Sequence, residues 1–206
     1  MMKSTTIKAL LLDIGGVLLT NGWDSASRKL AAEHFSIDLK ELNDRHRIIF
    51  EAYESGKMTL DEYLNLLIFC KERDFSIAEF KDFMYEQSQP YPEMIALIKG
   101  LKQKYGLQII AVNNEGRELN EYRVNKFDLK SIFDIFSSSC FVHTRKPDRD
   151  FYTLALDLAQ VKREEVIYVD DRPVFIQAAA LLGIPGIQHN HVEMTKLEFE
   201  AYGLKV

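Results

Sequence analysis

Polar side chains that can carry charge or bind an anion follow four strand-like segments of this 206-residue sequence. In an open parallel sheet, ligands bind outside the carboxyl ends of the strands, where residues far apart in the sequence meet. We therefore expect these side chains to share one crevice. They are Asp13 after the aliphatic run 7–12, Asn113 and Asn114 after residues 107–112, Lys146 beyond the serines 137–139, and Asp170 and Asp171 after residues 166–169.

The charges in this crevice indicate a metal ion. The carboxylates of Asp13, Asp170 and Asp171 would converge there, with Lys146 as the one obvious positive partner. Like charges at close range raise one another's energy, so these carboxylates cannot all stay ionised cheaply without a further counter-cation. A hard divalent cation with oxygen ligands meets this need, and magnesium is the common choice beside phosphate. The sequence thus predicts Mg²⁺ as cofactor.

Strand-like and helix-like segments alternate along most of the chain. The run 7–12 is aliphatic except for Lys8 and ends at Asp13, the pattern of a strand that is buried on both faces. Such alternation specifies an α/β fold, a doubly wound parallel sheet with helices on both faces and right-handed crossovers. Further strands are predicted at 107–112, 135–138, 166–169 and 184–187, with helices near 115–127 and 148–160 and a third that ends at Leu182.

The segment after the first strand has a different character. It is rich in charged and aromatic residues with helical spacing, and Thr59 followed by Glu62 fits a capping box at the start of a helix. We expect residues 21–88 to form a small helical cap. The α/β core would then consist of residues 1–20 and 89–206. Trp23 and Tyr53 are the aromatic residues of the cap that we expect to face a substrate.

The composition favours a small substrate. The net charge of −5 opposes an extended binding surface for nucleic acid or for anionic lipid. The apolar run 9–20 is short and interrupted by Asp13, so it is neither a signal peptide nor a membrane span, and we expect a cytoplasmic protein. Cys70 and Cys140 lie in apolar surroundings without CxxC spacing, which predicts two buried free thiols.

In their order along the chain, four of these segments resemble the motifs of the haloacid dehalogenase (HAD) superfamily of hydrolases. The resemblance covers nearly the whole chain outside the helical insertion, which is itself similar to the cap of the branch with small substrates. It implies a Rossmann-like core and phosphatase chemistry. The matching segments are LLLDIGGVL at 10–18, IIAVNN at 109–114, RKPD at 145–148 and YVDD at 168–171.

The resemblance implies a role for each residue of the crevice. Asp13 is the nucleophile that attacks phosphorus, which gives an aspartyl-phosphate that water then hydrolyses. Lys146 stabilises the phosphoryl oxygens and the nucleophile. The amide of Asn113 and the backbone N–H of Asn114 hold the phosphate. Mg²⁺ is held by Asp13, Asp171 and the backbone carbonyl of Gly15, with Asp170 beside it.

Two positions depart from the family pattern. The family's second Asp, two residues after the nucleophile, protonates the leaving group and then activates water, but Gly15 stands there. Loss of this acid–base group slows turnover, by roughly 100-fold to 10,000-fold, unless another group takes its place. Asn113 stands where a Ser or Thr hydroxyl is expected, and an amide reaches the phosphate differently. Reduced activity is therefore part of the prediction.

The leading prediction is a magnesium-dependent phosphomonoester hydrolase that acts on a small phosphorylated metabolite. Two alternatives stay open. One is a metal-independent 2-haloacid dehalogenase, against which the adjacent Asp170 and Asp171 argue because they would raise the energy of an ionised Asp13. The other is a catalytically weakened relative that binds a phosphorylated ligand or a partner protein through its cap. The sequence specifies neither the natural substrate nor the oligomeric state.

Overall fold

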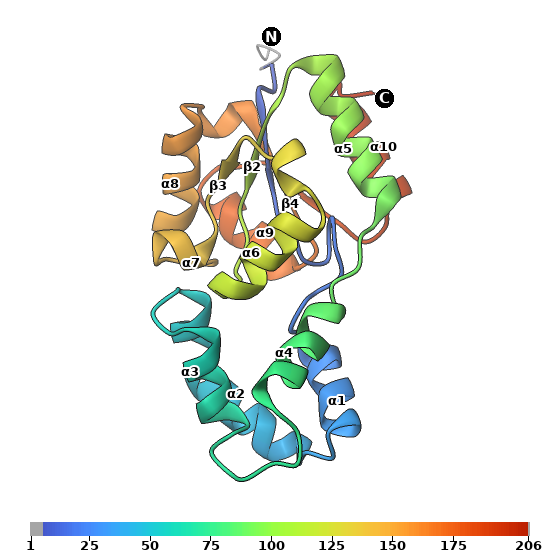
Figure 1. The fold of residues 1–206 in the computed structure, drawn as a ribbon. Helices are drawn as coiled ribbons and strands as arrows, with labels where there is room; N and C mark the ends of the chain where they lie inside the picture. Colours follow the sequence, from blue (N-terminus) through green and yellow to red (C-terminus); the bar gives the residue numbers. More distant parts are fainter. Residues whose placement is uncertain (1–5, 206) are drawn as a thin grey trace.

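A five-stranded parallel sheet lies at the centre of the computed structural model, which describes residues 6–205. The strand order is β3-β2-β1-β4-β5, so the first strand in the sequence is the middle strand of the sheet (Figure 1). The α/β fold class predicted from the sequence is confirmed. The strands are β1 (Ala9–Leu12), β2 (Gln108–Ala111), β3 (Ile135–Phe136), β4 (Val166–Asp170) and β5 (Gly186–Gln188).

Helices cover both faces of the sheet because its central strands are apolar on both sides. In β1, Leu10 and Leu12 pack into one core cluster while Ala9 and Leu11 pack into the other, as side-chain alternation along a strand requires. The first cluster includes α5 (Pro92–Tyr105) and α10 (Val192–Ala201), which lie side by side in Figure 1. The second includes α8 (Arg149–Ala159) and α9 (Pro173–Leu181). The core is therefore a three-layer α/β/α unit.

One helix of the core, α10, had no counterpart in the sequence prediction. Its apolar residues do not form a clean stripe, because Phe199 is buried while Met194 and Leu197 are exposed. The remaining elements of the core are α6 (Arg117–Lys126), α7 (Ser139–Val142) and the 3₁₀ helices η1 (Leu129–Ser131) and η2 (Arg163–Glu165).

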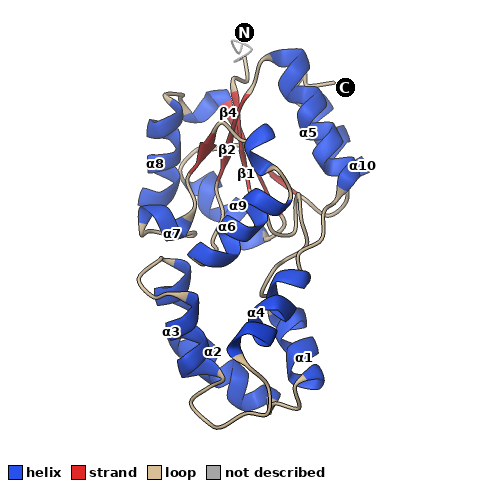
Figure 2. Cartoon of the chain, viewed as in Figure 1, coloured by secondary structure: helices blue, strands red, loops and turns tan. Residues whose placement is uncertain are grey.

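The segment inserted after β1 forms four helices below the sheet, which we call the cap (Figure 2). They enclose their own core, in which Tyr63 and Phe80 are fully buried. The capping box predicted at Thr59 and Glu62 is confirmed, with both of its reciprocal hydrogen bonds in place. The cap helices are α1 (Ser25–His34), α2 (Leu39–Glu54), α3 (Leu60–Leu67) and α4 (Ile77–Glu86).

Both connections between core and cap pass Thr20. Its backbone N–H donates to the carbonyl of Gln89 at 2.8 Å, and its hydroxyl donates to the carbonyl of Gln87 at 2.6 Å. The N–H of Gln89 returns a hydrogen bond to the Thr20 hydroxyl at 2.8 Å. The chain thus enters and leaves the cap through two segments that are hydrogen-bonded to each other.

Away from these connections, the end of α2 rests on the core. Ser139 Oγ donates to the carbonyl of Glu54 at 2.6 Å, and Nδ1 of His143 lies 2.8 Å from the carbonyl oxygen of Ser55. Gly56 has a φ of 66°, and a Cβ there would collide with the carbonyl oxygen of Cys140. Glycine is therefore required for this close approach. The cap is closed on the core.

The prediction of two buried thiols is confirmed for Cys140 and wrong for Cys70. Cys140 is buried, and burial raises the pKa of its thiol to about 12. Cys70 is exposed and lies in the turn beyond the end of α3. Within residues 6–205, no helix combines the length and apolar character needed to cross a membrane.

Candidate active site

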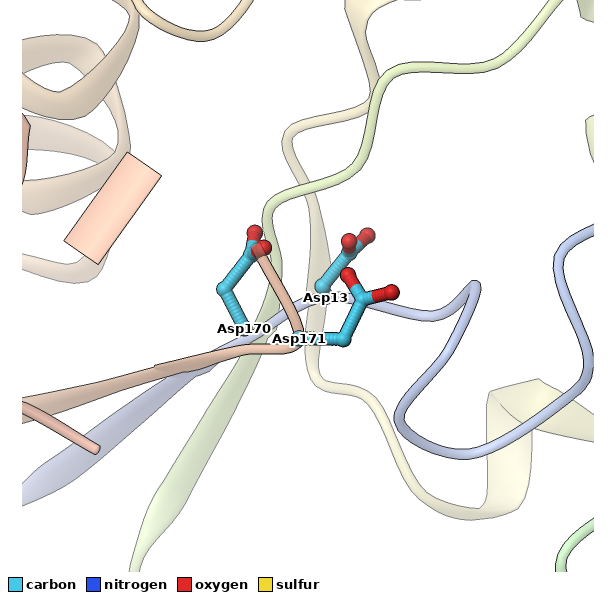
Figure 3. A group of neighbouring side chains, drawn as sticks. All are labelled: Asp13, Asp170 and Asp171. Atoms are coloured by element: carbon cyan, nitrogen blue, oxygen red, sulfur yellow. The ribbon is translucent and has the colours of Figure 1, made fainter. Parts of the chain in front are cut away.

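The acidic residues predicted to share a crevice do meet, at the carboxyl end of the sheet (Figure 3). Asp13 follows β1 and Asp170 ends β4, and these strands are neighbours with Leu12 paired to Val169. Asp171 comes directly after. One carboxylate oxygen from each of the three lies within 4.8 Å of the others.

Lys146 supplies the positive charge at this cluster. Its Nζ lies 3.0 Å from Oδ2 of Asp13 and 2.6 Å from Oδ2 of Asp170, and the side chain is 1% exposed. The loop that carries Lys146 is fixed by Asn114, whose amide accepts from the backbone N–H of Lys146 and donates to its carbonyl, both at 2.9 Å. The structure therefore brings Asn114 and Lys146 together as predicted, through the Asn114 side chain.

One lysine does not neutralise three carboxylates. Burial and the charges of Asp170 and Asp171 raise the pKa of Asp13 to about 7, although the Lys146 ammonium acts in the opposite direction. Burial also raises the pKa of Asp171. Although burial lowers it, the two neighbouring carboxylates raise the pKa of Lys146 overall. The site holds surplus negative charge that a bound cation would stabilise.

The available oxygen atoms suit a hard cation such as Mg²⁺. Within residues 6–205, Oδ1 of Asp171 is buried without a hydrogen-bond partner, and its Oδ2 accepts from Asn21 Nδ2 at 3.2 Å. Gly16, with a φ of 74°, leaves room for the Asp171 carboxylate, because a Cβ there would collide with it. Asp13 and Asp171 can therefore hold Mg²⁺, while the carbonyl of Gly15 as a third ligand stays a prediction.

Asp170 has less freedom. Its Oδ2 accepts from Lys146 and from the hydroxyl of Tyr168, and its Oδ1 accepts from the backbone N–H of Arg172 at 2.8 Å. Both carboxylate oxygens are thus engaged within the protein, and the side chain is 0% exposed. In this arrangement Asp170 positions Lys146 and adds negative charge beside the metal site.

Asn113 is also tied to the core. Its amide nitrogen donates to Oδ1 of Asn120 at 3.0 Å, and its amide oxygen accepts from the Ser138 hydroxyl at 2.7 Å. The residue lines the cavity described below but is only 2% exposed. Its role as a phosphate donor stays a prediction, and its amide would have to exchange a partner to take that role.

A cavity of about 410 Å³ lies between the acidic cluster and the cap. Its core side contains Asp13 and Lys146, and its cap side is aromatic and charged. Trp23 and Tyr53, the two cap residues expected to face substrate, both line it. The other lining residues of the cap helices are Ser25, Arg28, His46, Phe50 and Glu54.

Hydrogen bonds fix one aromatic wall of this cavity. The hydroxyl of Tyr63 accepts from Trp23 Nε1 at 2.9 Å and lies 2.6 Å from Nδ1 of His46. Because the indole can only donate, the Tyr63 hydroxyl is free to donate its proton to His46. This requires neutral imidazole, and burial accordingly lowers the pKa of His46 to about 4.

Sequence reasoning missed two charged residues of the cavity, Glu115 and Arg123. Arg123 Nη1 donates to Oε2 of Glu115 at 2.6 Å, and the two side chains are 2% and 10% exposed. Arg123 also donates to the carbonyl of Thr20, next to the cap. The signal that could have revealed Glu115 is its place directly after Asn114, at the same strand end. Nothing in the sequence pairs it with Arg123.

The fold and its acidic centre define an α/β protein whose site lies at the carboxyl edge of a doubly wound sheet. A family model described as haloacid dehalogenase-like hydrolase matches residues 7–183, and the chain belongs to this family. The resemblance drawn from the four motifs is thereby confirmed.

Individual relatives are distant. The chain is 28% identical over 187 residues to "Drimenol cyclase drtB" of Aspergillus calidoustus, a match that covers 88% of this chain but only 34% of that protein. It is 26% identical over 190 residues to "Phosphorylated carbohydrates phosphatase" of Thermotoga maritima, covering 88% of this chain and 84% of the relative.

Solved structures share the fold. A HAD family enzyme from Bacteroides thetaiotaomicron, in complex with magnesium and inorganic phosphate, superposes with a TM-score of 0.72 at 19% identity. The match covers 89% of this chain and 94% of that one.

Proposed function

We propose that the protein is a magnesium-dependent phosphomonoester hydrolase that acts on a small phosphorylated metabolite through an aspartyl-phosphate on Asp13. The observation that carries the proposal is the position of Asp13. Its carboxylate lies 3.0 Å from the buried Lys146 ammonium and among the acids that can hold a cation, and it lines the cavity. A phosphatase and a magnesium–phosphate complex among the related proteins support it.

Each residue of the proposed active site has its own role. Lys146 holds the Asp13 carboxylate and would stabilise the negative oxygens of a phosphoryl group placed beside it. Asp13 would displace the leaving oxygen at phosphorus, which divides hydrolysis into two easier steps. When bound by Asp13 and Asp171, Mg²⁺ would supply charge neutralisation and Lewis acidity at the phosphoryl oxygens. The cap covers one side of the cavity.

The size and lining of the cavity support a compact polar substrate. Its volume of about 410 Å³ is in the lower part of the usual range for small-molecule sites, roughly 300–1,000 Å³. The aromatic residues Trp23, Phe50 and Tyr53 offer flat apolar contacts beside the charged groups of Arg28 and Glu54. Such a lining suits a phosphorylated sugar or a nucleotide-type monoester.

The test is phosphate release from p-nitrophenyl phosphate and from a panel of sugar phosphates and nucleotides, with Mg²⁺ and then with excess chelator. We expect release that requires Mg²⁺ and that Asp13→Asn lowers by at least about 1,000-fold. Thermal unfolding of the variant controls for folding. Halide release from a 2-chloroalkanoic acid without metal would instead establish a dehalogenase. Folded protein that binds Mg²⁺ and releases neither product would establish the non-catalytic alternative.

A further inference from the structure

The space that a side chain at position 15 would enter is already filled. A Cβ built on Gly15 would lie 2.9 Å from Oδ1 of Asn21 and 3.6 Å from Nη1 of Arg123. That same Nη1 donates to Oε2 of Glu115 at 2.6 Å. The carboxylate of Glu115, which follows a different strand, therefore lies just beyond the space that an acidic side chain at position 15 would occupy.

Glu115 faces the cavity that holds Asp13. Both residues line it, together with Gly15 and Gly22 between them, and a Cβ on Gly22 would lie 3.4 Å from Oε2 of Glu115. Arg123 holds Oε2 of this carboxylate, and the backbone N–H of Gly116 also interacts with the carboxylate group. The carboxylate is thus held in place at the wall of the cavity.

Glu115 is better placed to exchange a proton than the other acids of the core. Both oxygens of Asp170 are engaged, and those of Asp13 and Asp171 are assigned to phosphorus and metal. Burial raises the pKa of Glu115 to about 7, although the Arg123 guanidinium opposes the shift and the Glu54 carboxylate adds to it. A group that titrates near neutral pH can both give and accept a proton.

We propose that Glu115 is the general acid and base of the reaction, in place of the carboxylate that Gly15 lacks. The inference rests on the proposed phosphatase function. In the first step, the bond from Asp13 to phosphorus forms, the bond from phosphorus to the ester oxygen breaks, and the Glu115 proton passes to that oxygen. In the second, a water oxygen bonds to phosphorus, the bond to Asp13 breaks, and the water proton returns to Glu115.

Arg123 is a positioning residue in this scheme. It is 2% exposed and joins Glu115 to the Thr20 carbonyl, at the entrance to the cap. Groups from several elements face Glu115 and share its electrostatics. They are Arg123 on α6, Tyr53 and Glu54 on α2, Tyr63 on α3 and Cys140 on α7.

The test compares phenyl phosphate with 2,4-dinitrophenyl phosphate, whose leaving oxygen needs no proton. kcat/KM reports the first step, in which the ester bond breaks. We expect Glu115→Gln to lower kcat/KM for phenyl phosphate by at least about 100-fold and for the dinitrophenyl ester by less than about 5-fold. Glu51→Gln, on α2, is the control, because it removes another carboxylate from an ion pair with Arg145 and is not among the groups that shift the pKa of Glu115. It should affect both esters equally.

An equal loss for both esters in Glu115→Gln would overturn the inference and assign the pair with Arg123 a structural role. If wild-type protein with Mg²⁺ hydrolyses neither ester, the proposed function itself fails. The unmodified protein provides a measurement that does not depend on folding of the variant. Its kcat/KM for phenyl phosphate should fall as the pH rises above about 7, while the dinitrophenyl ester shows no such fall. Identical profiles would contradict the role of Glu115.

Discussion

The Nζ atom of Lys146 lies 3.0 Å from Oδ2 of Asp13, at the carboxyl end of the central strand. The contact joins a loop residue to a strand-end residue 133 positions earlier in the chain, and both side chains are buried. Its strength depends on Asp170, which accepts from the same ammonium at 2.6 Å. Lys146 is therefore shared between the carboxylate that we propose as the nucleophile and a carboxylate that is held on both oxygens within the protein.

Removing this shared cation should destabilise the protein. In Lys146→Met, two buried carboxylates lose their partner, and breaking a buried ion pair in this way costs about 3–5 kcal/mol. Urea denaturation at pH 7.5 in chelator measures the free energy of unfolding. Adding Asp170→Asn to the variant should recover part of the loss. Equal stability of Lys146→Met and wild type would show that the carboxylates are protonated without the lysine.

Gly16→Ala should remove metal binding more than it removes stability. A Cβ at Gly16 collides with the Asp171 carboxylate and would displace it from the site. The matched control is Gly106→Ala, whose φ of 64° is similarly positive but whose Cβ would meet nothing within 4 Å. Both variants pay roughly 1–2 kcal/mol for the left-handed backbone. Only Gly16→Ala should lose Mg²⁺ binding by calorimetry, and binding retained there would contradict the metal assignment of Asp171.

Magnesium should raise the melting temperature through Asp171. Ligand binding to the native state adds RT ln(1 + [L]/Kd), about 2.7 kcal/mol at 100 times Kd. The buried, unpartnered Oδ1 of Asp171 gains a partner in this way. We expect the Mg²⁺-dependent shift in Asp171→Asn to be much smaller, while Asp82→Asn, an exposed acid on α4, keeps it. A full shift in Asp171→Asn would place the ion elsewhere.

The neutral His46 should make the cap sensitive to acid. Its pKa is about 4 in the folded protein, against an ordinary value of 6.5. Between these values the unfolded chain binds more protons, so the free energy of unfolding falls as the pH decreases from 6.5 to 4. Since His46 is partly exposed, we expect a loss of only about 1–2 kcal/mol. Urea denaturation of wild type and His46→Gln at several pH values measures the contribution of His46 to the free energy of unfolding. If this free energy falls equally with pH in both proteins, His46 makes no such contribution.

The sequence predicts the part of the site that the strands position. Asp13 and Asp170 end neighbouring parallel strands, so the topology brings them together whatever the loops do. Lys146 could be predicted because it lies between a strand and a helix in the segment RKPD, which resembles a motif of the family. The strand pattern of β1 and the capping box at Thr59 were equally readable, because each depends on residues within one turn or one strand.

Features that depend on side-chain direction across loops could not be predicted. The pairing joins Glu115, two residues before α6 begins, to Arg123 in the second turn of that helix, and no sequence pattern predicts it. The amide of Asn113 turns toward Asn120 and Ser138, although its position suggests a phosphate ligand. The outward side chain of Cys70 likewise follows from the turn after α3 and from no sequence pattern.

Two separate sets of contacts hold the cap on the core. Its two connections are joined at Thr20, while the contacts of Glu54 and Ser55 with the core lie elsewhere on its edge. A movement of the cap that left its connections in place would therefore break only the few hydrogen bonds at the end of α2. For the proposed reaction, we expect mutations of Ser139 or His143 to change the rates of substrate binding and product release and to leave the bond-breaking step unchanged.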